Sequence, residues 1–409
     1  MHAGSFGKDV DVTKDRVMSV LRTELQARQG TTRLNTDAHL TLEKRGVSAG
    51  RIVLHEDAFV SMLYLERRRA ERAQKRFVLM LVDMKNAIAD GQKNRTLAKV
   101  TGALLSVTRE TDIVGWYLED HLIGVICTEV GKAKSKTVQG RMLDKVKTAF
   151  VQVLPAEKVS KITVSFHFFP EEGEEGGTDH SANITLYPDL SRQEESRKLA
   201  LGIKRSMDVV GSAAALVLLA PLFGAVSLAI KLSSKGPVLF KQERLGQYGK
   251  KFTVLKFRSM RTNCDARIHE EYVNQFIAGQ VDGTSQGGNK PVFKIQEDPR
   301  VTRVGRFLRR TSLDELPQFW NVMVGDMSLV GPRPPLPYEF KAYDLWHRRR
   351  VLEIKPGITG LWQVKGRSRT RFDEMVRLDL KYARGWSIWL DVKILLQTPG
   401  AVLTGEGAH

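Results

Sequence analysis

Residues 209–230 read VVGSAAALVLLAPLFGAVSLAI, a run of 22 residues without a charged side chain. At 1.5 Å per residue, a straight helix of this length would be about 33 Å long, enough to cross the hydrocarbon core of a bilayer. Pro221 lies in the middle, where it removes a backbone donor and clashes with the carbonyl of Val217, so we expect a kink. Both flanks are basic, with Arg205 before the run and Lys231 after it, whereas a spanning helix usually has asymmetric flanking charge. The run favours a broken helix that enters the membrane and returns to the same face. A spanning helix and a buried core helix are the alternatives.

The composition limits the kinds of partner and compartment. A chain of 409 residues is long enough for two or three domains, and its formal net charge of +18 predicts an anionic partner. Phosphate-rich substrates, anionic lipids and nucleic acids all qualify, but the apolar run argues against nucleic acid. Cys127 and Cys264 are far apart, which argues against a disulfide framework or a zinc site and fits a reducing compartment. The N-terminus lacks the basic-then-apolar pattern of a secretory leader.

The pattern of apolar and polar residues divides the chain into five regions. We predict a polar tail over 1–50, an α/β domain over 51–172, a linker over 173–200, a membrane helix over 201–235 and a basic domain rich in motifs over 236–409. In the α/β domain the expected order is helix, strand, helix, strand, strand, helix, strand, which is typical of a small α/β sandwich. The acidic, Gly-rich stretch PEEGEEGGTDH marks the linker.

The adjacent carboxylates Asp314 and Glu315 lie in GRFLRRTSLDELPQFWNV, shortly after Arg309. One interpretation is structural, with Asp314 as a helix N-cap and Pro317 in the tolerant first turn. The other is catalytic, because a carboxylate that attacks a phosphate is a negative group approaching another. Two like charges about 4 Å apart repel by roughly 4 kcal/mol at an effective dielectric of 20, and arginines or a divalent metal offset this repulsion. The arginines on either side, including Arg333 in a Gly-Pro-Arg-Pro turn, favour phosphoryl chemistry.

Two further segments are basic. KFTVLKFRSMR places Lys256 and Arg258 on a predicted strand and its exit. KPGITGLWQVKGRSR places Arg367 in a glycine-containing loop that can approach a nucleotide closely. Because basic loops are commonly solvated surface, each segment is a weak signal by itself.

Residues from about 202 to 409 resemble the monotopic polyprenyl-phosphate phosphoglycosyl transferases, also called bacterial sugar transferases. The resemblance rests on the apolar run and on the motifs KRSMD, GPVLFKQERLG, KFRSM, DPRVTRVGRFLRRTSLDELPQFWNV, GDMSLVGPRP and KPGITGLWQVKGR in this order. It implies transfer of a sugar 1-phosphate from a UDP-sugar to undecaprenyl phosphate, with release of UMP and use of Mg²⁺, as the first step of exopolysaccharide or O-antigen synthesis. It also implies a re-entrant helix, with the catalytic and N-terminal domains on the cytoplasmic face of the bacterial inner membrane. Many members have Ser-Pro at the helix break, whereas this chain has Ala220-Pro221, so another group must satisfy the freed backbone carbonyl.

The resemblance also assigns roles to residues. Asp314 matches the nucleophile that attacks the β-phosphorus and forms a covalent phosphosugar intermediate. Glu315 matches the partner acid, which assists metal binding or proton handling, so both carboxylates are candidate Mg²⁺ ligands. The candidate substrate-binding residues, from the family motifs and the basic segments together, are Lys256, Arg258, Arg309, Arg333 and Arg367. Similarity to long-chain members makes a hexose such as glucose or galactose the expected sugar.

Residues 51–172 resemble a GGDEF (diguanylate-cyclase-like) domain in their element order. The signature has decayed, because LEDHL (118–122) stands where the family has Gly-Gly-Asp/Glu-Glu-Phe, and its larger side chains would obstruct the approach of phosphates. We therefore expect no cyclase activity. Arg109 and Asp112 match the Arg-x-x-Asp of the family's inhibitory cyclic-di-GMP site, with Arg141 as a second arginine whose planar guanidinium suits guanine and phosphate. The alternative is an exposed ion pair at a strand entrance, in a pseudo-cyclase domain that is purely structural or that forms a homodimer.

The predicted fold class is thus α+β. It comprises a GGDEF-like α/β sandwich, a membrane re-entrant helix and a mainly helical catalytic domain with a small sheet. The competing function is a non-catalytic, membrane-tethered cyclic-di-GMP receptor that recruits a polysaccharide machine. The intact carboxylate dyad and its arginines disfavour that alternative.

Overall fold

The computed structural model describes residues 51–88, 93–128, 130–131, 135–171, 182–261, 267–280, 300–366 and 370–403. The chain forms two compact units, and each is described by itself. The first contains residues up to Leu63 and Arg76–Phe168, and the second contains Tyr64–Lys75 and the residues from Phe169 onward. The predictions for the 1–50 tail, most of the acidic linker stretch and Arg367 lie outside the described residues.

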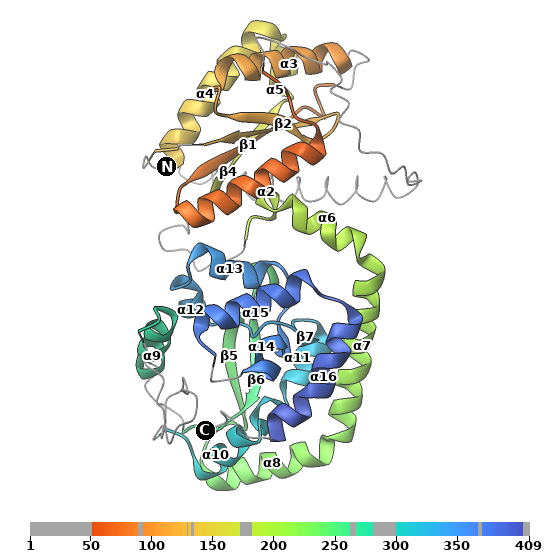
Figure 1. The fold of residues 1–409 in the computed structure, drawn as a ribbon, viewed down its shortest axis with the longest axis vertical. Coiled ribbons are helices and arrows are strands. Elements are labelled where there is room, and N and C mark those ends of the chain that lie inside the picture. Colours follow the sequence, from red (N-terminus) through yellow and green to blue (C-terminus); the bar gives the residue numbers. More distant parts are fainter. Residues whose placement is uncertain are drawn as a thin grey trace, which may run out of the picture. The chain divides into compact units, whose positions relative to one another are not determined.

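The first unit has the predicted order of elements, with one added short helix, α5 (Figure 1). Its elements are α2 (Glu56–Ala73, which continues into the second unit), β1 (Phe77–Asp83), α3 (Lys93–Val107), β2 (Ile113–Leu118), β3 (Leu122–Cys127), α4 (Ser135–Val153), α5 (Ala156–Ser160) and β4 (Thr163–Phe169). The strands form one sheet in the order β2-β3-β1-β4, in which β3 is antiparallel to both β1 and β2.

Strand β1 lies inside the sheet and is buried on both faces. On one face Val78, Met80 and Val82 pack with residues of α3 and α4 in a common apolar core. On the other face the ring of Phe59, from α2, lies over the sheet. A Cβ on Gly124 would lie 2.4 Å from that ring, so the helix packs this closely only because the strand has a glycine there.

The second unit is mainly helical, as predicted for this half of the chain, but it has two small two-stranded sheets where a single one was predicted. Before the active-site region come η2 (Ile184–Leu186), α6 (Pro188–Ser196), α7 (Lys198–Leu218), α8 (Ala220–Ser233), β5 (Leu239–Leu245), η3 (Gln247–Gly249), β6 (Lys251–Phe257) and α9 (Arg267–Ile277). After it come α10 (Arg303–Arg310), η4 (Leu313–Glu315), α11 (Gln318–Val324), β7 (Ser328–Val330), α12 (Pro337–Lys341), α13 (Leu345–Leu352), β8 (Gly357–Thr359), α14 (Leu361–Lys365), α15 (Phe372–Arg384) and α16 (Ile388–Leu403).

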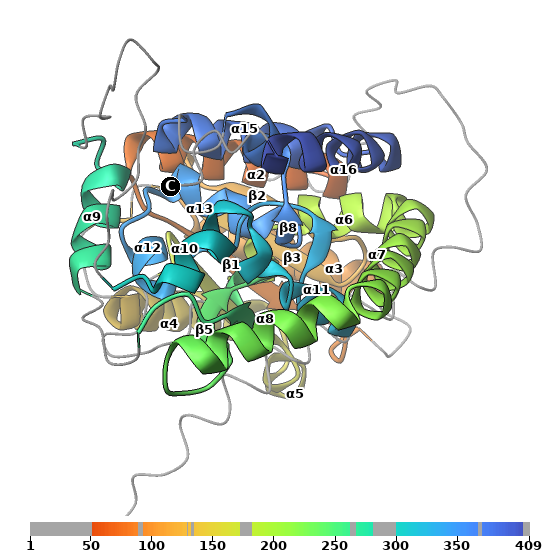
Figure 2. The same ribbon diagram turned by 90° about the horizontal axis from the view of Figure 1, so that it is seen from below.

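The apolar run forms two helices, because the chain breaks next to Pro221. Among the described residues no single helix is long and apolar enough to cross a bilayer, but α7 and α8 together reach that length and composition across a 60° bend. The expected kink is therefore confirmed. Figure 2 shows α8 crossing the end of the unit after leaving α7, with α10 beside it.

The two small sheets place the active-site segments. Strands β5 and β6 form an antiparallel hairpin in which Phe240 is opposite Lys256. Strands β7 and β8 are parallel, with Ser328 opposite Gly357 and Val330 opposite Thr359. Since the Gly-Pro-Arg-Pro turn follows β7 directly, its position depends on this second sheet.

Candidate active site

The two carboxylates lie in η4, a single 3-10 turn that follows α10. Ser312, just before this turn, has a left-handed backbone with φ 56°, a conformation that is uncommon for a residue other than glycine and that reverses the chain after α10. Asp314 is only 9% exposed. The N-cap interpretation of Asp314 is wrong, because helix α11 begins at Gln318 with Pro317 as its cap and Asp314 lies inside the preceding turn.

Lys256 on β6 holds the second carboxylate. Its Nζ lies 2.7 Å from Oε1 of Glu315, so the ammonium donates a charge-assisted hydrogen bond to this acid. Both side chains are partly exposed, which leaves this pair accessible to a substrate. The structure thus brings together the dyad and one of the predicted substrate-binding cations.

The dyad is asymmetric in its electrostatics. Burial, followed by the neighbouring negative charge of Glu315, raises the pKa of Asp314 to about 6, although Lys256 and Arg309 act in the opposite direction. Burial alone would also raise the pKa of Glu315, but Lys256, with Arg333 and Arg244, outweighs it and holds that pKa below its ordinary value. Environments that separate the pKa values of two adjacent acids are typical of sites in which the two have different roles.

Arg244 is a functional candidate that the sequence analysis missed. It lies at the end of β5 within GPVLFKQERLG, it is buried, and its Nη1 donates a 2.7 Å hydrogen bond to the carbonyl of Pro334. Gln242 accepts from its Nε and Nη2 at 3.1 and 2.8 Å. Because it also lowers the pKa of Glu315, this arginine links the hairpin to both the dyad and the turn that contains Arg333. Only its place in a recognised motif could have indicated it.

The Gly-Pro-Arg-Pro turn, residues 331–334, is held through its backbone. Besides the bond from Arg244, the Gly357 amide donates to the carbonyl of Pro332 at 2.9 Å. A Cβ on Gly357 would lie 2.0 Å from the backbone nitrogen of the first residue of the turn, so strand β8 approaches this closely only with glycine at this position. The fixed backbone sets the place from which Arg333 acts.

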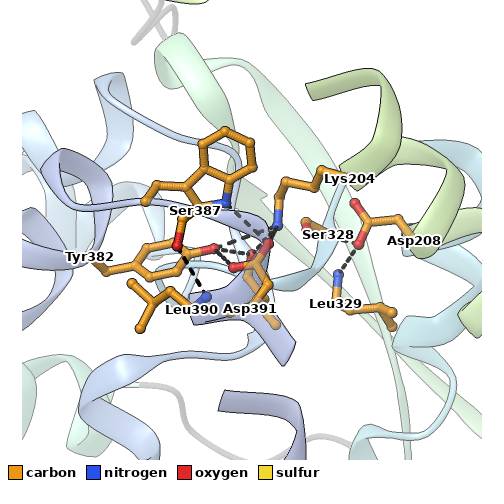
Figure 3. Close-up of polar contacts among 10 residues, drawn as sticks. Lys204, Asp208, Ser328, Leu329, Tyr382, Ser387, Leu390 and Asp391 are labelled. Atoms are coloured by element: carbon orange, nitrogen blue, oxygen red, sulfur yellow. Dashed lines mark hydrogen bonds and ion pairs between the residues drawn. The ribbon is translucent and has the colours of Figure 1, made fainter. Parts of the chain in front are cut away.

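A buried polar network lies at the start of this turn (Figure 3). Nζ of Lys204, on α7, is 2.6 Å from Oδ2 of Asp391 on α16 and donates to the carbonyl of Val330 at 3.1 Å. The Tyr382 hydroxyl lies 2.6 Å from the other oxygen of Asp391 and 3.1 Å from the same carbonyl. Nε1 of Trp386 also donates to Asp391, at 3.1 Å. Three helices thus meet at the last residue of β7.

The rest of the KRSMD motif anchors α7 to the same region. Oδ1 of Asp208 accepts from the Ser328 hydroxyl at 3.0 Å and from the Leu329 amide at 2.9 Å, as Figure 3 shows. Arg205 donates from Nη1 to the carbonyl of Val322 at 2.7 Å, near the C-terminus of α11. This motif therefore ties α7 to the elements on either side of the dyad.

Two of the predicted substrate-binding arginines remain to be placed. Arg258 is buried and donates from Nη1 to the Lys235 carbonyl at 3.0 Å and from Nη2 to the Ser234 carbonyl at 2.7 Å, just after the end of α8. In the structure it therefore fixes the exit of α8, and its contact with a substrate stays a prediction. Arg367 lies outside the described residues.

The expected Mg²⁺ can be tested against the donor groups that the dyad offers. Within the described ranges, no group of three or more His, Cys, Asp and Glu side chains is placed to hold a metal. Mg²⁺ in phosphoryl-transfer sites is commonly held by one or two carboxylates together with substrate phosphates and water. Asp314 and Glu315 meet that requirement, so the residues fit a metal that is bound jointly with substrate.

In the first unit, Arg109 and Asp112 form a closed turn. The Asp112 carboxylate accepts from the Arg109 amide at 2.8 Å, and the Asp112 amide donates to the Arg109 carbonyl at 3.0 Å. Arg51 donates to the carbonyls of both residues. Arg109 and Arg141 are exposed, and the structure records no contact between them within its described residues.

The second unit matches a known protein family. The model of the family "Bacterial sugar transferase" matches residues 199–405. The chain belongs to this family. The matched range begins at the second residue of α7 and includes every later element through α16, and with them the dyad.

Several members of the family are similar in sequence over this range. The galactosyl transferase CpsE of Streptococcus agalactiae is 44% identical over 207 residues, which are 50% of this chain and 43% of that protein. The undecaprenyl-phosphate galactose phosphotransferase of Salmonella typhimurium is 41% identical over 51% of this chain and 42% of its own. The chain thus spans less than half the length of these two relatives. The exopolysaccharide production protein ExoY of Rhizobium meliloti is 38% identical over 50% of this chain and 88% of its own length.

Solved structures of diguanylate cyclases and GGDEF domains are also similar to part of the chain. A DGC protein from Thermotoga maritima has 20% sequence identity, covers 29% of this chain and 84% of its own, and has a TM-score of 0.25. A score of this size supports no argument about function.

Proposed function

We propose that this chain is a membrane-bound phosphoglycosyl transferase that moves a hexose 1-phosphate from a UDP-sugar to undecaprenyl phosphate and releases UMP. The observation that supports this most is the asymmetric dyad of a family member, with a buried Asp314 beside a Glu315 that is paired to Lys256. The names of the relatives, a galactosyl transferase and a galactose phosphotransferase, support a hexose and this acceptor. The family match also favours an enzyme over a non-catalytic receptor.

The chemistry that we propose has two displacements at one phosphorus. An oxygen of the ionised Asp314 attacks the β-phosphorus of the UDP-sugar, forming an aspartyl–phosphorus bond while the bond to the bridging oxygen breaks and UMP leaves. A phosphate oxygen of undecaprenyl phosphate then attacks the same phosphorus and releases the Asp314 carboxylate. Both steps bring anions together, and Arg309, Arg333 and Lys256 are the side chains that offset this repulsion.

The partner acid has a separate task in this proposal. Its low pKa keeps Glu315 ionised, so it can hold Lys256 in place and act as a metal ligand together with Asp314. Bound Mg²⁺ would neutralise negative charge on the phosphates during transfer. Arg244 positions the Arg333 turn through the Pro334 carbonyl and is not expected to touch the substrate.

We further propose that α7 and α8 form the re-entrant element of a protein bound to the cytoplasmic face of the inner membrane. Large apolar side chains of the pair are exposed, including Val217, Leu218, Leu228 and Leu232. Phe307, on the helix that contacts α8, is exposed as well. Apolar side chains in such number on adjacent helices favour insertion in lipid, and the bend favours return to one face.

One experiment tests the catalytic proposal directly. The full-length protein in detergent is given UDP-glucose or UDP-galactose with undecaprenyl phosphate, and UMP release is measured for wild type, Asp314→Asn and Glu315→Gln. We expect no turnover and no trapped phosphosugar-enzyme with Asp314→Asn, and residual turnover with Glu315→Gln. If Asp314→Asn still forms the covalent intermediate, the nucleophile is another residue.

A further inference from the structure

A pocket of about 660 Å³ opens on the second unit, and its lining is strongly basic. None of its lining residues within the described chain is acidic, and Asp314, Glu315, Lys256 and Arg333 are not among them. The cationic lining residues are Arg68, Arg349, Arg377, Lys381 and Arg384. Arg68 belongs to the stretch of α2 that clusters with this unit, and the others come from α13 and α15.

Three of these cations follow one face of α15. Arg377, Lys381 and Arg384 are spaced i, i+4 and i+7, which aligns them on one side of a helix. All three are exposed, and the structure shows neither an ion pair nor a side-chain hydrogen bond for Arg377 or Lys381 among the residues it describes. Like charges at this spacing destabilise a helix, so the arrangement calls for an anion to offset it.

Arg349 gives the pocket a buried donor. The residue is only 9% exposed, and its Nη1 has no hydrogen-bond partner among the described residues. Its Nη2 pairs with Glu353, and its Nε lies 3.9 Å from Glu71, so the two acids engage the other nitrogens of the guanidinium. A buried donor without a partner is costly, so turning this side chain toward an anion bound in the pocket would satisfy it.

Trp346 adds an aromatic wall to the basic pocket. It is half-buried and packs against the core formed by residues of α12, α13 and α15, which holds the indole in place. A fixed aromatic ring beside arginines offers a stacking surface for a planar base as well as donors for phosphate. The volume lies within the range of roughly 300–1,000 Å³ that is usual for small-molecule sites.

The position of the pocket favours a soluble ligand over a membrane lipid. Helix α13 lies at the end of the second unit opposite α8 (Figure 1), whereas the exposed apolar side chains of the re-entrant pair lie on α7 and α8. Arg350, next to Arg349, pairs with Asp379 at 2.6 Å and donates weakly to the Arg333 carbonyl at 3.4 Å. Helix α13 therefore contacts the Arg333 turn through Arg350 and lines the pocket through Arg349. No residue of the turn lines the pocket.

We propose that this pocket is a second ligand site, which binds a nucleoside phosphate with its base against Trp346 and its phosphates on Arg349, Arg377 and Lys381. The site is separate from the dyad and does not depend on the proposed transferase activity.

Binding to the full-length protein in phosphatidylcholine nanodiscs, which can be mixed with lipid vesicles, tests this proposal. The probe is methylanthraniloyl-GTP, followed by fluorescence, with tripolyphosphate, UDP-glucose and phosphatidylglycerol vesicles as competitors. We expect the double variant Arg377→Ala/Lys381→Ala to bind the probe at least ten-fold more weakly. The matched control is Lys341→Ala/Lys393→Ala, which removes two exposed cations of the same unit outside the pocket and should bind like wild type.

The competitors and a tryptophan variant decide what the pocket recognises. Trp346→Leu should reduce the affinity for GTP to that for tripolyphosphate. Trp346→Phe keeps an aromatic ring, so it should retain most of the difference in affinity between GTP and tripolyphosphate. The proposal fails if both double variants bind equally, or if tripolyphosphate or the vesicles displace the probe from wild type as effectively as GTP does. It also fails if UDP-glucose displaces the probe at concentrations that saturate turnover, since the pocket would then belong to the catalytic site.

Discussion

At the scale of single residues, Asp314 and Glu315 are neighbours in the chain with opposite electrostatic surroundings. Asp314 is buried and is deprived of water, whereas Glu315 has an ammonium 2.7 Å away and two further arginines that favour its charge. A poorly solvated Asp314 beside a Glu315 whose pKa is held low fits the proposed two-step displacement at phosphorus, in which the first acid attacks and the second stays ionised. This difference gives two predictions.

The first concerns the pH dependence of transfer. The pKa of Asp314 is about 6, above its ordinary value, so the attacking carboxylate is lost as the pH falls through about 6 and kcat/KM should fall with it. Lys256 lowers that pKa, so Lys256→Gln should move the acid limb of the profile to higher pH. Lys251→Gln, at the far end of the same strand and paired with Glu243, is the control that should leave the limb in place. Profiles of UMP release at one fixed Mg²⁺ concentration measure this. An acid limb that Lys256→Gln leaves unchanged would contradict it.

The second concerns stability. Because the folded-state pKa of Asp314 lies above its ordinary value of 3.8, the folded state loses stability as the pH rises from that value through about 6. Asp314→Asn removes this cost, so it should abolish turnover and yet unfold at a higher temperature than wild type at pH 8. The difference should be on the order of 1–3 kcal/mol. Thermal unfolding at pH 8 and pH 4 measures it, and the gain should vanish at the lower pH. A variant that is less stable than wild type at pH 8 would show that burial does not penalise this charge.

The sequence identified both carboxylates and Lys256, Arg309 and Arg333, because these residues lie in recognisable motifs. Arg244 also lies in a motif, GPVLFKQERLG, but nothing in that motif distinguishes it from the other lysines and arginines of the chain, which number 64 in all. The importance of Arg244 comes from burial and from its bond to the Pro334 carbonyl, 90 residues away, and neither has a local signature.

At the scale of elements, the buried network at Val330 holds three helices against one strand end. Lys204→Met would leave the Asp391 carboxylate buried without its cation, which typically costs about 3–5 kcal/mol. The double variant Lys204→Met/Asp391→Leu removes both charges and should recover most of this stability. It still lacks the bond from Nζ to the Val330 carbonyl, so the turn with Arg333 should be less well placed and the KM for UDP-sugar should stay raised. Unfolding temperature and KM, with the exposed Lys198→Met as control, separate these effects. A double variant with the wild-type KM would make the network purely structural.

The bend between α7 and α8 gives a prediction of topology. If the pair enters and leaves the membrane on one side, single cysteines at Gly202 and at Ser234, before and after the apolar stretch, should both be protected from a membrane-impermeant thiol reagent added from the periplasm. Both should react after the cells are permeabilised. The experiment uses a Cys264→Ser background, because Cys127 is already buried. Periplasmic labelling of one flank alone would show that the pair spans the bilayer.

Local chemistry predicted some elements well and others not at all. Pro221 was sufficient to predict the break, because its ring removes a backbone donor and clashes with the preceding turn, which kinks or ends a helix. Pro399, by contrast, lies inside α16. The N-cap assigned to Asp314 was wrong because the turn of η4 depends on the left-handed Ser312, and a serine gives no signal for that conformation. The pairing of β7 with β8 was also not predictable from strands of three residues each, since their register is set by the close approach at Gly357.

At the scale of the whole molecule, a unit that belongs to the sugar transferase family is joined to an α/β unit with the element order predicted from the sequence. The element order of the first unit was predictable because its strands are continuous apolar runs separated by amphipathic helices. The role of Arg109, Asp112 and Arg141 was not predictable in this way. In the structure the Asp112 carboxylate accepts a hydrogen bond that closes its own turn, which is a local structural role.

That local use makes the regulatory proposal testable with a clean variant. We propose that cyclic-di-GMP binds at Arg109 and changes the rate of transfer. Asp112 accepts from the backbone amide of Arg109, so Arg109→Ala removes the guanidinium and keeps the turn, whereas Asp112→Ala opens the turn itself.

Calorimetry on the full-length protein should therefore detect micromolar binding to wild type, a loss of binding in Arg109→Ala and no change in the unfolding temperature of that variant. Arg95→Ala, which removes another arginine of the same unit outside the motif, should bind like wild type. Because a planar guanidinium contributes contacts with guanine that an ammonium cannot reproduce, Arg109→Lys should fail to restore binding. If wild type takes up no cyclic-di-GMP at these concentrations, the first unit has a different role and the motif is only the turn that the structure shows.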